Sequence, residues 1–339
     1  MGNATRCEGV MDFICEDYDI DVMTSDKAYT FFEGHSKITN LFRQLDIQRP
    51  LRFEFGSFLY YLSQLNFFFT RIFKNYFLQK EIIKKNNYDL LVFDSDYSFV
   101  LHRLFGAVKV VGINNAFEVV KYFSQNKQEL KPEYFFSFLL ELLDYFTCRL
   151  FLNYLFCPSV GWPRLSEFSD RRRFIVPLLV RERVLKDIKP SDGSVLFISS
   201  SSEVKSPLQE VFRTYQRRYT PKSEGQRFEK NNIASLQAAS AIFCNSGQSS
   251  VAECLYLKKP AVLFPIPKHA EQWANARLAE SAQIKIYTAC ELPALIAELQ
   301  SGSRQEPHSG ETMKKYRESR EVFLKYFNAL SKTEERVSP

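Results

Sequence analysis

Residues 244–276 read CNSGQSSVAECLYLKKPAVLFPIPKHAEQWANA, and this stretch decides the fold. The apolar run 241–244 predicts a short strand that ends at a Ser-Gly turn, and a helical pattern follows from about Ser249. The first backbone N–H groups of a helix have no internal partner, and the helix dipole favours negative charge at that end. Strand, turn and helix together therefore predict an anion site.

The residues around this turn are the candidate anion ligands: Ser246, Gly247, Gln248, Ser249 and Ser250. Gly247 would let a phosphate approach the backbone closely. Glu253 lies one turn further into the helix, where a carboxylate could accept both hydrogen bonds of a ribose diol. Each residue also has a plainer interpretation, since the serines could simply form a turn and helix cap and Glu253 could be solvated.

A second apolar run, 260–265, predicts another buried strand, and a helix opens after it at Glu271. Glu271, Gln272 and Asn275 share one helix face because they are spaced three and four residues apart. That face offers donors and acceptors to a hydroxyl-rich ligand, although Asn275 could instead brace a loop. Phosphate, diol and polyol sites in this order suit a nucleotide sugar.

The segment 228–276 resembles the donor-binding half of GT-B glycosyltransferases of the family 28 type. The shared pattern is a strand, Ser-Gly, a Glu six residues after the Gly, a Pro-led strand and Gln-x-x-Asn-Ala. The resemblance implies an α/β fold of two Rossmann-like domains that face each other across a cleft. It also implies inverting transfer from a UDP-sugar, with an N-acetylhexosamine favoured, and base contact through the backbone of Phe228 and Glu229.

Length and composition agree with this fold. A chain of 339 residues with 45% hydrophobic and 25% charged content is expected to form about two globular domains. We expect an acceptor-side Rossmann-like domain at 1–173, closed by a helix at 135–156 and a linker at 157–173. A donor domain at 174–300 follows, and 301–339 form a spacer, a return helix and a disordered tail. One apolar stripe of the return helix contains Tyr316, Phe323, Phe327 and Leu330.

Net charge and cysteine spacing indicate which kinds of ligand and partner the protein could bind. The net charge of +6 suits an anionic membrane surface or a phosphorylated substrate, and no nucleic-acid-binding motif is present. The seven Cys show no metal-ligand spacing, which fits free thiols in the cytoplasm. We therefore expect no metal and no cofactor, because the helix dipole and Arg6 can supply the positive potential at the diphosphate.

The amino terminus departs from the family pattern. In similar GT-B proteins a first strand leads into a Gly-x-Gly-His-x-x-Arg loop, whereas this sequence starts at that loop, with Asn3 at the His position and Arg6 in place. Either the true start lies upstream or the domain lacks its central first strand. A parallel sheet without a middle strand would expose two unpaired edges.

The sequence leaves several candidates for the residue that acts as the catalytic base. Asn3 stands at the position of a candidate base, but an amide cannot take a proton at neutral pH. Asp94 and Asp96 follow the predicted strand 88–93, and carboxylates at the carboxyl end of such a strand face the interdomain cleft. They are substitute candidates, although either residue could instead cap the next helix. Asn114-Asn115 follow the next predicted strand, 108–113, at a similar position.

The region 53–85 predicts a long aromatic-rich helix with several basic residues: Arg71, Lys74, Lys80, Lys84 and Lys85. Such a surface could lie on the inner face of the membrane, as in family members with lipid-linked acceptors. The alternative is that the aromatic residues are core and the lysines are solvated.

The sequence thus predicts a glycosyltransferase that uses a UDP-sugar and an unknown acceptor, which could be lipid-linked, a polysaccharide end or a small molecule. The main alternative is a catalytically inactive or partner-dependent GT-B protein that binds nucleotide sugars. Sugar-nucleotide epimerisation and a membrane-attached scaffold are further alternatives.

Overall fold

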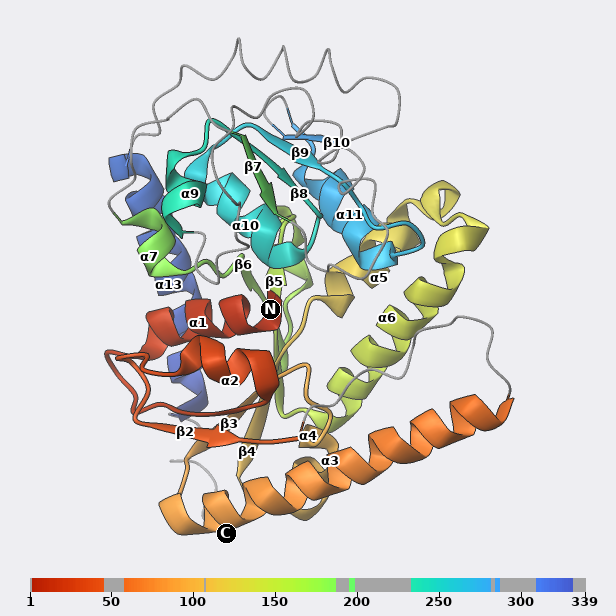
Figure 1. Ribbon diagram of the computed structural model, residues 1–339, viewed down its shortest axis with the longest axis vertical. Coiled ribbons are helices and arrows are strands. Elements are labelled where there is room, and N and C mark those ends of the chain that lie inside the picture. Colours follow the sequence, from red (N-terminus) through yellow and green to blue (C-terminus); the bar gives the residue numbers. More distant parts are fainter. Residues whose placement is uncertain are drawn as a thin grey trace, which may run out of the picture.

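The computed structural model describes residues 2–45, 58–106, 108–186, 195–198, 233–281, 284–286 and 309–331 (Figure 1). The strands of these residues form three parallel sheets, two with four strands and one with two. Helices lie between successive strands, which is the alternation expected of Rossmann-like halves. The predicted α/β fold is therefore confirmed.

The amino-terminal half contains a sheet of order β3-β4-β5-β6 and the separate pair β1-β2. The strand residues of β4 and β5 are almost all buried, as expected when helices cover both faces of a parallel sheet. The elements are α1 (Gly2–Ile14), β1 (Asp21–Thr24), α2 (Asp26–Phe32), β2 (Asn40–Arg43), α3 (Phe58–Asn86), β3 (Leu90–Asp94), α4 (Phe99–Phe105), β4 (Lys109–Ile113), α5 (Ala116–Gln125), η1 (Lys127–Glu129), α6 (Pro132–Phe151), β5 (Tyr154–Ser159), η2 (Arg164–Phe168) and β6 (Arg173–Pro177).

The second half contains a sheet of order β10-β9-β8-β7. The strand residues of β8 and β9 are completely buried, and α10 and α11 follow them directly. The elements are α7 (Glu182–Leu185), β7 (Val195–Ile198), α9 (Ile233–Ala238), β8 (Ala241–Cys244), α10 (Gln248–Leu257), β9 (Ala261–Leu263), α11 (Ala270–Ala279), β10 (Ile284–Ile286) and α13 (Ser309–Ser331).

The last helix, α13, returns to the first half. Its stripe of Tyr316, Phe323, Phe327 and Leu330 is buried, as predicted. Phe323 packs against Phe13 of α1 and Phe156 of β5, with ring centroids 5.5 and 4.9 Å apart. One continuous core cluster thus includes residues of α1, α13 and both large sheets.

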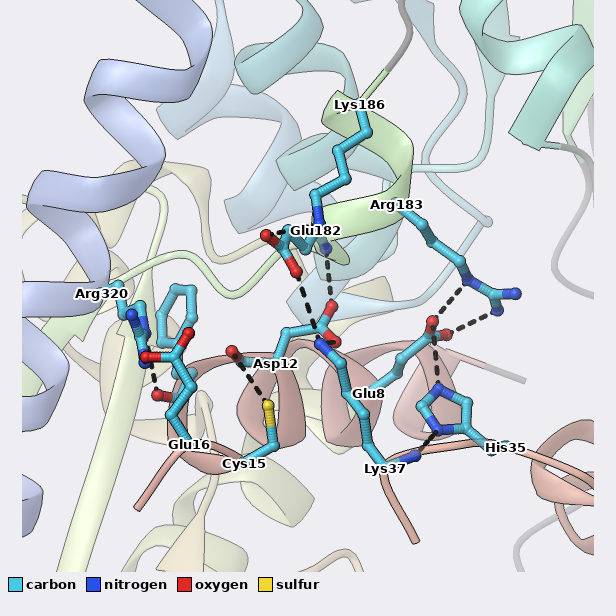
Figure 2. Close-up of polar contacts among 11 residues, drawn as sticks. Glu8, Asp12, Cys15, Glu16, His35, Lys37, Glu182, Arg183, Lys186 and Arg320 are labelled. Carbon is cyan, nitrogen blue, oxygen red and sulfur yellow. Dashed lines mark hydrogen bonds and ion pairs between the residues drawn. The ribbon is translucent and has the colours of Figure 1, made fainter. Parts of the chain in front are cut away.

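Polar contacts also fix α1 against the second half (Figure 2). Lys37 Nζ lies 2.7 Å from Asp12 and 3.4 Å from Glu182, and the backbone N–H of Glu182 donates to Asp12 at 2.6 Å. Arg183 donates to the buried Glu8 at 2.8 Å. The first helix is therefore a shared element of the two halves.

Two boundaries differ from the sequence prediction. The predicted helix 135–156 ends at Phe151, and a strand, β5, begins at Tyr154 within the same apolar run. A fully buried strand has no polar alternation, so periodicity could not separate it from the apolar helix before it. The predicted domain boundary at 173/174 falls inside β6, because Phe174–Pro177 pair with β5.

The predicted absence of a first strand is seen in the sheet order. Within the described residues β1 pairs only with β2 and β3 only with β4, so no strand joins the two sheets. Val92 of β3 is 40% exposed, whereas Val110 and Val111 of the neighbouring β4 are fully buried. Each sheet therefore has an open edge where the other would continue it.

Candidate functional site

The amino end of α10 forms the centre of the site. Gly247 precedes the helix with φ −65° and ψ 144°, and no side chain caps the helix there. A Cβ added to Gly247 would meet no atom within 4 Å. The space above the turn is open, and the first N–H groups of the helix point toward it. This geometry fits the predicted anion site.

Arg6 of α1 reaches this turn from the first half. Its Nη1 donates to Gln248 Oε1 at 3.1 Å, and its Nε donates to Asp94 Oδ2 at 2.8 Å. Its Nη2 also pairs with the second oxygen of Asp94 and lies 3.5 Å from Asn3 Oδ1. The fold therefore brings together residues that are 242 positions apart in the sequence.

The pair of Arg6 and Asp94 is buried and charged. Burial alone lowers the pKa of Arg6, but the Asp94 carboxylate outweighs that effect and raises the pKa above its ordinary value. Arg6 is thus a permanent cation next to the open turn.

The two aspartates predicted as candidate bases have different surroundings. Asp94 faces Arg6 and also accepts from Ser95 Oγ at 3.1 Å. Asp96 accepts from the backbone N–H of Ser98 at 2.9 Å and from Gln79 at 3.1 Å, so it holds the turn that leads into α4. Asp94 is linked through Arg6 to Gln248 at the start of α10, and Asp96 shapes a loop.

Glu253 lies in a buried ion pair. Arg181 donates to Glu253 Oε1 through Nε at 2.9 Å and Nη2 at 2.5 Å, and burial raises the pKa of Glu253. The side chain is therefore not the solvated helix residue of the plainer interpretation. A ribose diol would have to share this carboxylate with Arg181.

The polar residues of α11 divide into residues that brace the Ser246-Gly247 turn and Glu271, which contacts the first half. Ser246 Oγ donates to the backbone carbonyl of Gln272 at 2.8 Å, and Asn275 Nδ2 donates to the carbonyl of Ser246 at 3.1 Å. Gln272 Oε1 accepts from the backbone N–H of Ile266 at 3.0 Å. These contacts brace the Ser246-Gly247 turn, as one interpretation of Asn275 expected. Glu271 instead accepts from Asn115 across the two halves, at 2.9 Å.

Some positioning residues were missed by the sequence prediction. Glu118 is fully buried and accepts from Ser159 Oγ at 2.7 Å and from the backbone of Gly161 at 2.8 Å. Burial raises the pKa of this carboxyl group. Near the carboxyl end of β5, the carbonyl of Pro158 accepts a hydrogen bond from Gln248 Nε2 at 2.6 Å. Neither Glu118 nor Arg181 stands in a recognisable motif, so only the folded chain reveals them.

Two predicted base-contact residues, Phe228 and Glu229, lie outside the described residues. Among the side chains that the structure does describe, no group of three or more His, Cys, Asp or Glu could hold a metal ion.

The buried pair of Arg181 and Glu253 yields a stability prediction. Glu253→Ala leaves a buried arginine without its partner, so we expect the free energy of unfolding to fall by about 3 to 5 kcal/mol. The double variant Arg181→Met/Glu253→Leu removes both charges and should recover most of that loss. Urea denaturation of the single and double variants measures both effects, and equal losses in the two would contradict the interaction.

Solved structures with the same fold span nearly the whole chain. The calicheamicin glycosyltransferase matches at 14% identity and TM-score 0.57, covering 98% of this chain and 96% of its own. An Arabidopsis thaliana protein crystallised with UDP-L-rhamnose matches at 13% identity and TM-score 0.56, covering 93% and 90%. At these identities the similarity shows the fold alone, which is GT-B.

The sequence comparisons concern the family. No curated protein sequence matches the chain. The family model described as glycosyl transferase family 1 matches residues 1–296, which is most of the sequence. This match and the GT-B structures confirm the resemblance to GT-B glycosyltransferases, and the closer tie to family 28 stays a prediction. The protein belongs to glycosyl transferase family 1.

Proposed function

We propose that this glycosyltransferase takes its sugar from a UDP-sugar, with an N-acetylhexosamine as the favoured group. The observation that carries the proposal is the open, uncapped amino end of α10 above Gly247, next to the buried cation of Arg6. These features suit a pyrophosphate. A protein of the same fold was crystallised with UDP-L-rhamnose, which supports a uridine nucleotide as donor.

In this mechanism the N–H groups of α10 and Arg6 stabilise the leaving diphosphate as its negative charge develops. Glu253 contacts the ribose, and Glu271 contacts the sugar hydroxyls from the first turn of α11. The family and the fold support a transferase, so the inactive alternative is not favoured.

Gly247 gives a direct test of donor binding. Gly247 has an extended backbone that any residue can adopt, and a Cβ meets no atom there, so Gly247→Val should fold normally. Its side chain would occupy the space of the diphosphate, and we expect calorimetric UDP binding to weaken at least tenfold. The exposed Ser124→Val on α5 is the matched control and should bind like the wild type. UDP binding unchanged by Gly247→Val would reject this placement of the diphosphate.

Asp94 is the proposed base for the acceptor hydroxyl. In the ligand-free protein Arg6 neutralises it, but Arg6 also contacts Gln248, the first residue of α10. A bound diphosphate competes for Arg6 and leaves Asp94 able to accept a proton. Donor binding and activation of the base are thereby coupled.

The base assignment predicts different effects for the two aspartates. Asp94→Asn should lower kcat at least about 100-fold, because general-base contributions are of this size. Asp96→Asn keeps the side-chain oxygen that accepts from the backbone N–H of Ser98 and should change kcat little. Steady-state kinetics with saturating UDP-sugar compares them. A larger loss in Asp96→Asn would move the role to that residue.

We also propose that the first half lies on a membrane surface and that the acceptor is lipid-linked. No helix among the described residues is both long and apolar enough to span a bilayer. Instead, exposed apolar side chains line two helices, α3 and α6, that both pack against α4. On α3 they are Phe69, Phe73 and Phe77, and on α6 they are Phe135, Leu139, Leu143, Phe146 and Leu150. Figure 1 shows the two helices diverging from near α4. Regular exposed stripes of this size indicate a binding surface, and the neighbouring lysines of α3 favour anionic lipid.

Vesicle binding tests this surface. The double variant Lys84→Glu/Lys85→Glu should lower binding to vesicles containing phosphatidylglycerol at least fivefold, because each cation near the surface contributes about 1 kcal/mol. Lys314→Glu/Arg317→Glu on the exposed face of α13 makes the same change in net charge and serves as control. Equal losses for both doubles would indicate a non-specific charge effect. Binding that survives Phe73→Ser/Phe77→Ser would also argue against the proposal.

A further inference from the structure

The side chain of Gln248, the first residue of α10, reaches from the second half into the first. Only 6% of Gln248 is exposed. Its Nε2 donates to the backbone carbonyl of Pro158 in β5 at 2.6 Å, and its Oε1 accepts from Arg6 Nη1 at 3.1 Å. Both ends of the side-chain amide are therefore engaged by residues of the first half.

The carbonyl of Pro158 needs a donor because β4 ends too early to supply one. Two residues earlier in β5, the carbonyl of Phe156 accepts from the backbone N–H of Asn114, directly after the last residue of β4. Carbonyls two residues apart in a strand point to the same side, so that of Pro158 points past the end of β4. A buried carbonyl without a partner is costly. Gln248 supplies the missing donor.

The chain that follows Pro158 is fixed from within the first half by the buried carboxylate of Glu118. This carboxylate accepts from Ser159 Oγ at 2.7 Å and from the backbone N–H groups of Val160 and Gly161 at 3.1 and 2.8 Å. The Pro158 carbonyl thus has a defined position, and it defines in turn where the start of α10 lies.

The two partners allow only one orientation of the Gln248 amide. A carbonyl oxygen can only accept a hydrogen bond, and a guanidinium can only donate. The amide nitrogen must therefore face Pro158, and the amide oxygen must face Arg6. Because Nε and Nη2 of Arg6 pair with Asp94, the oxygen of Gln248 keeps the remaining Nη1 beside the start of α10.

We propose that Gln248 is a positioning residue for the donor diphosphate and acts through Arg6. Its side chain does not bind the anion, because both ends of the amide are engaged. Instead it holds Arg6 Nη1 next to the first turn of α10. Nη1 has two N–H groups, so Gln248 leaves one of them to donate to a diphosphate oxygen. This inference rests on the proposed function, which places the diphosphate at α10.

A double-variant cycle of UDP binding tests whether Gln248 acts through Arg6. Gln248→Met keeps an unbranched side chain but forms neither hydrogen bond, and we expect calorimetric UDP binding to weaken at least tenfold. Arg6→Lys keeps the charge but lacks the fork that contacts Asp94 and Gln248 together. In the Arg6→Lys background, Gln248→Met should weaken UDP binding less than twofold, because effects of coupled residues do not add.

Gln237→Met is the matched control. Gln237 is also buried, and its Nε2 donates to a backbone carbonyl, that of Val184 in α7, at 3.1 Å. This variant should lower the Tm about as much as Gln248→Met and should bind UDP like the wild type. Gln248→Asn is a milder second variant that keeps the amide on a side chain too short to span both partners. We expect it to weaken UDP binding at least threefold.

Three results would overturn this inference alone. Equal weakening by Gln248→Met in both backgrounds would mean that Gln248 does not act through Arg6. The same loss of affinity in Gln237→Met would mean a general effect of stability. Wild-type affinity in Gln248→Asn would mean that the amide need not span its two partners. A wild-type protein that binds no UDP would instead reject the proposed function, and this inference with it.

Discussion

The buried guanidinium of Arg6 is the interaction on which the site depends. It lies on the first helix, pairs with the end of β3 and reaches the start of α10 in the other half. A charge this deeply buried is tolerated because a carboxylate and an amide oxygen surround it. One side chain therefore sets the separation of the two halves at the point where a diphosphate would bind.

Further along α1, buried charges are again compensated by partners, but here the buried groups of α1 are negative. Glu8 and Asp12 are buried acids, and they find partners in Arg183, Lys37 and the backbone of Glu182 (Figure 2). Trp273 of α11 provides another junction, since it stacks on Tyr134 with ring centroids 5.6 Å apart and donates to Glu129 at 2.9 Å. Several independent contacts thus hold the two halves together.

The sequence predicted the secondary structure around α10 well because its signals are local. The Ser-Gly turn before α10 and the apolar stripe of α13 follow from short-range spacing and turn chemistry. Partners that meet only in the folded chain could not be predicted. Arg181 and Glu253 are 72 residues apart, and no local sequence pattern around either residue predicts that they pair. The strand β5 could not be predicted for a different reason. The end of the helix before it and the buried strand itself are both apolar, so periodicity does not separate them.

The return of α13 has a consequence for biosynthesis. Its Phe323 and Phe327 pack against Phe156 of β5, yet they follow the strands of both halves in the sequence. The first half cannot complete its core until these residues have left the ribosome. An amino-terminal domain usually folds while the next one is still being made. Here the core of the first half is complete only after α13 has been made. During translation the nascent first half therefore exposes the apolar surface that α13 covers until this helix has been made.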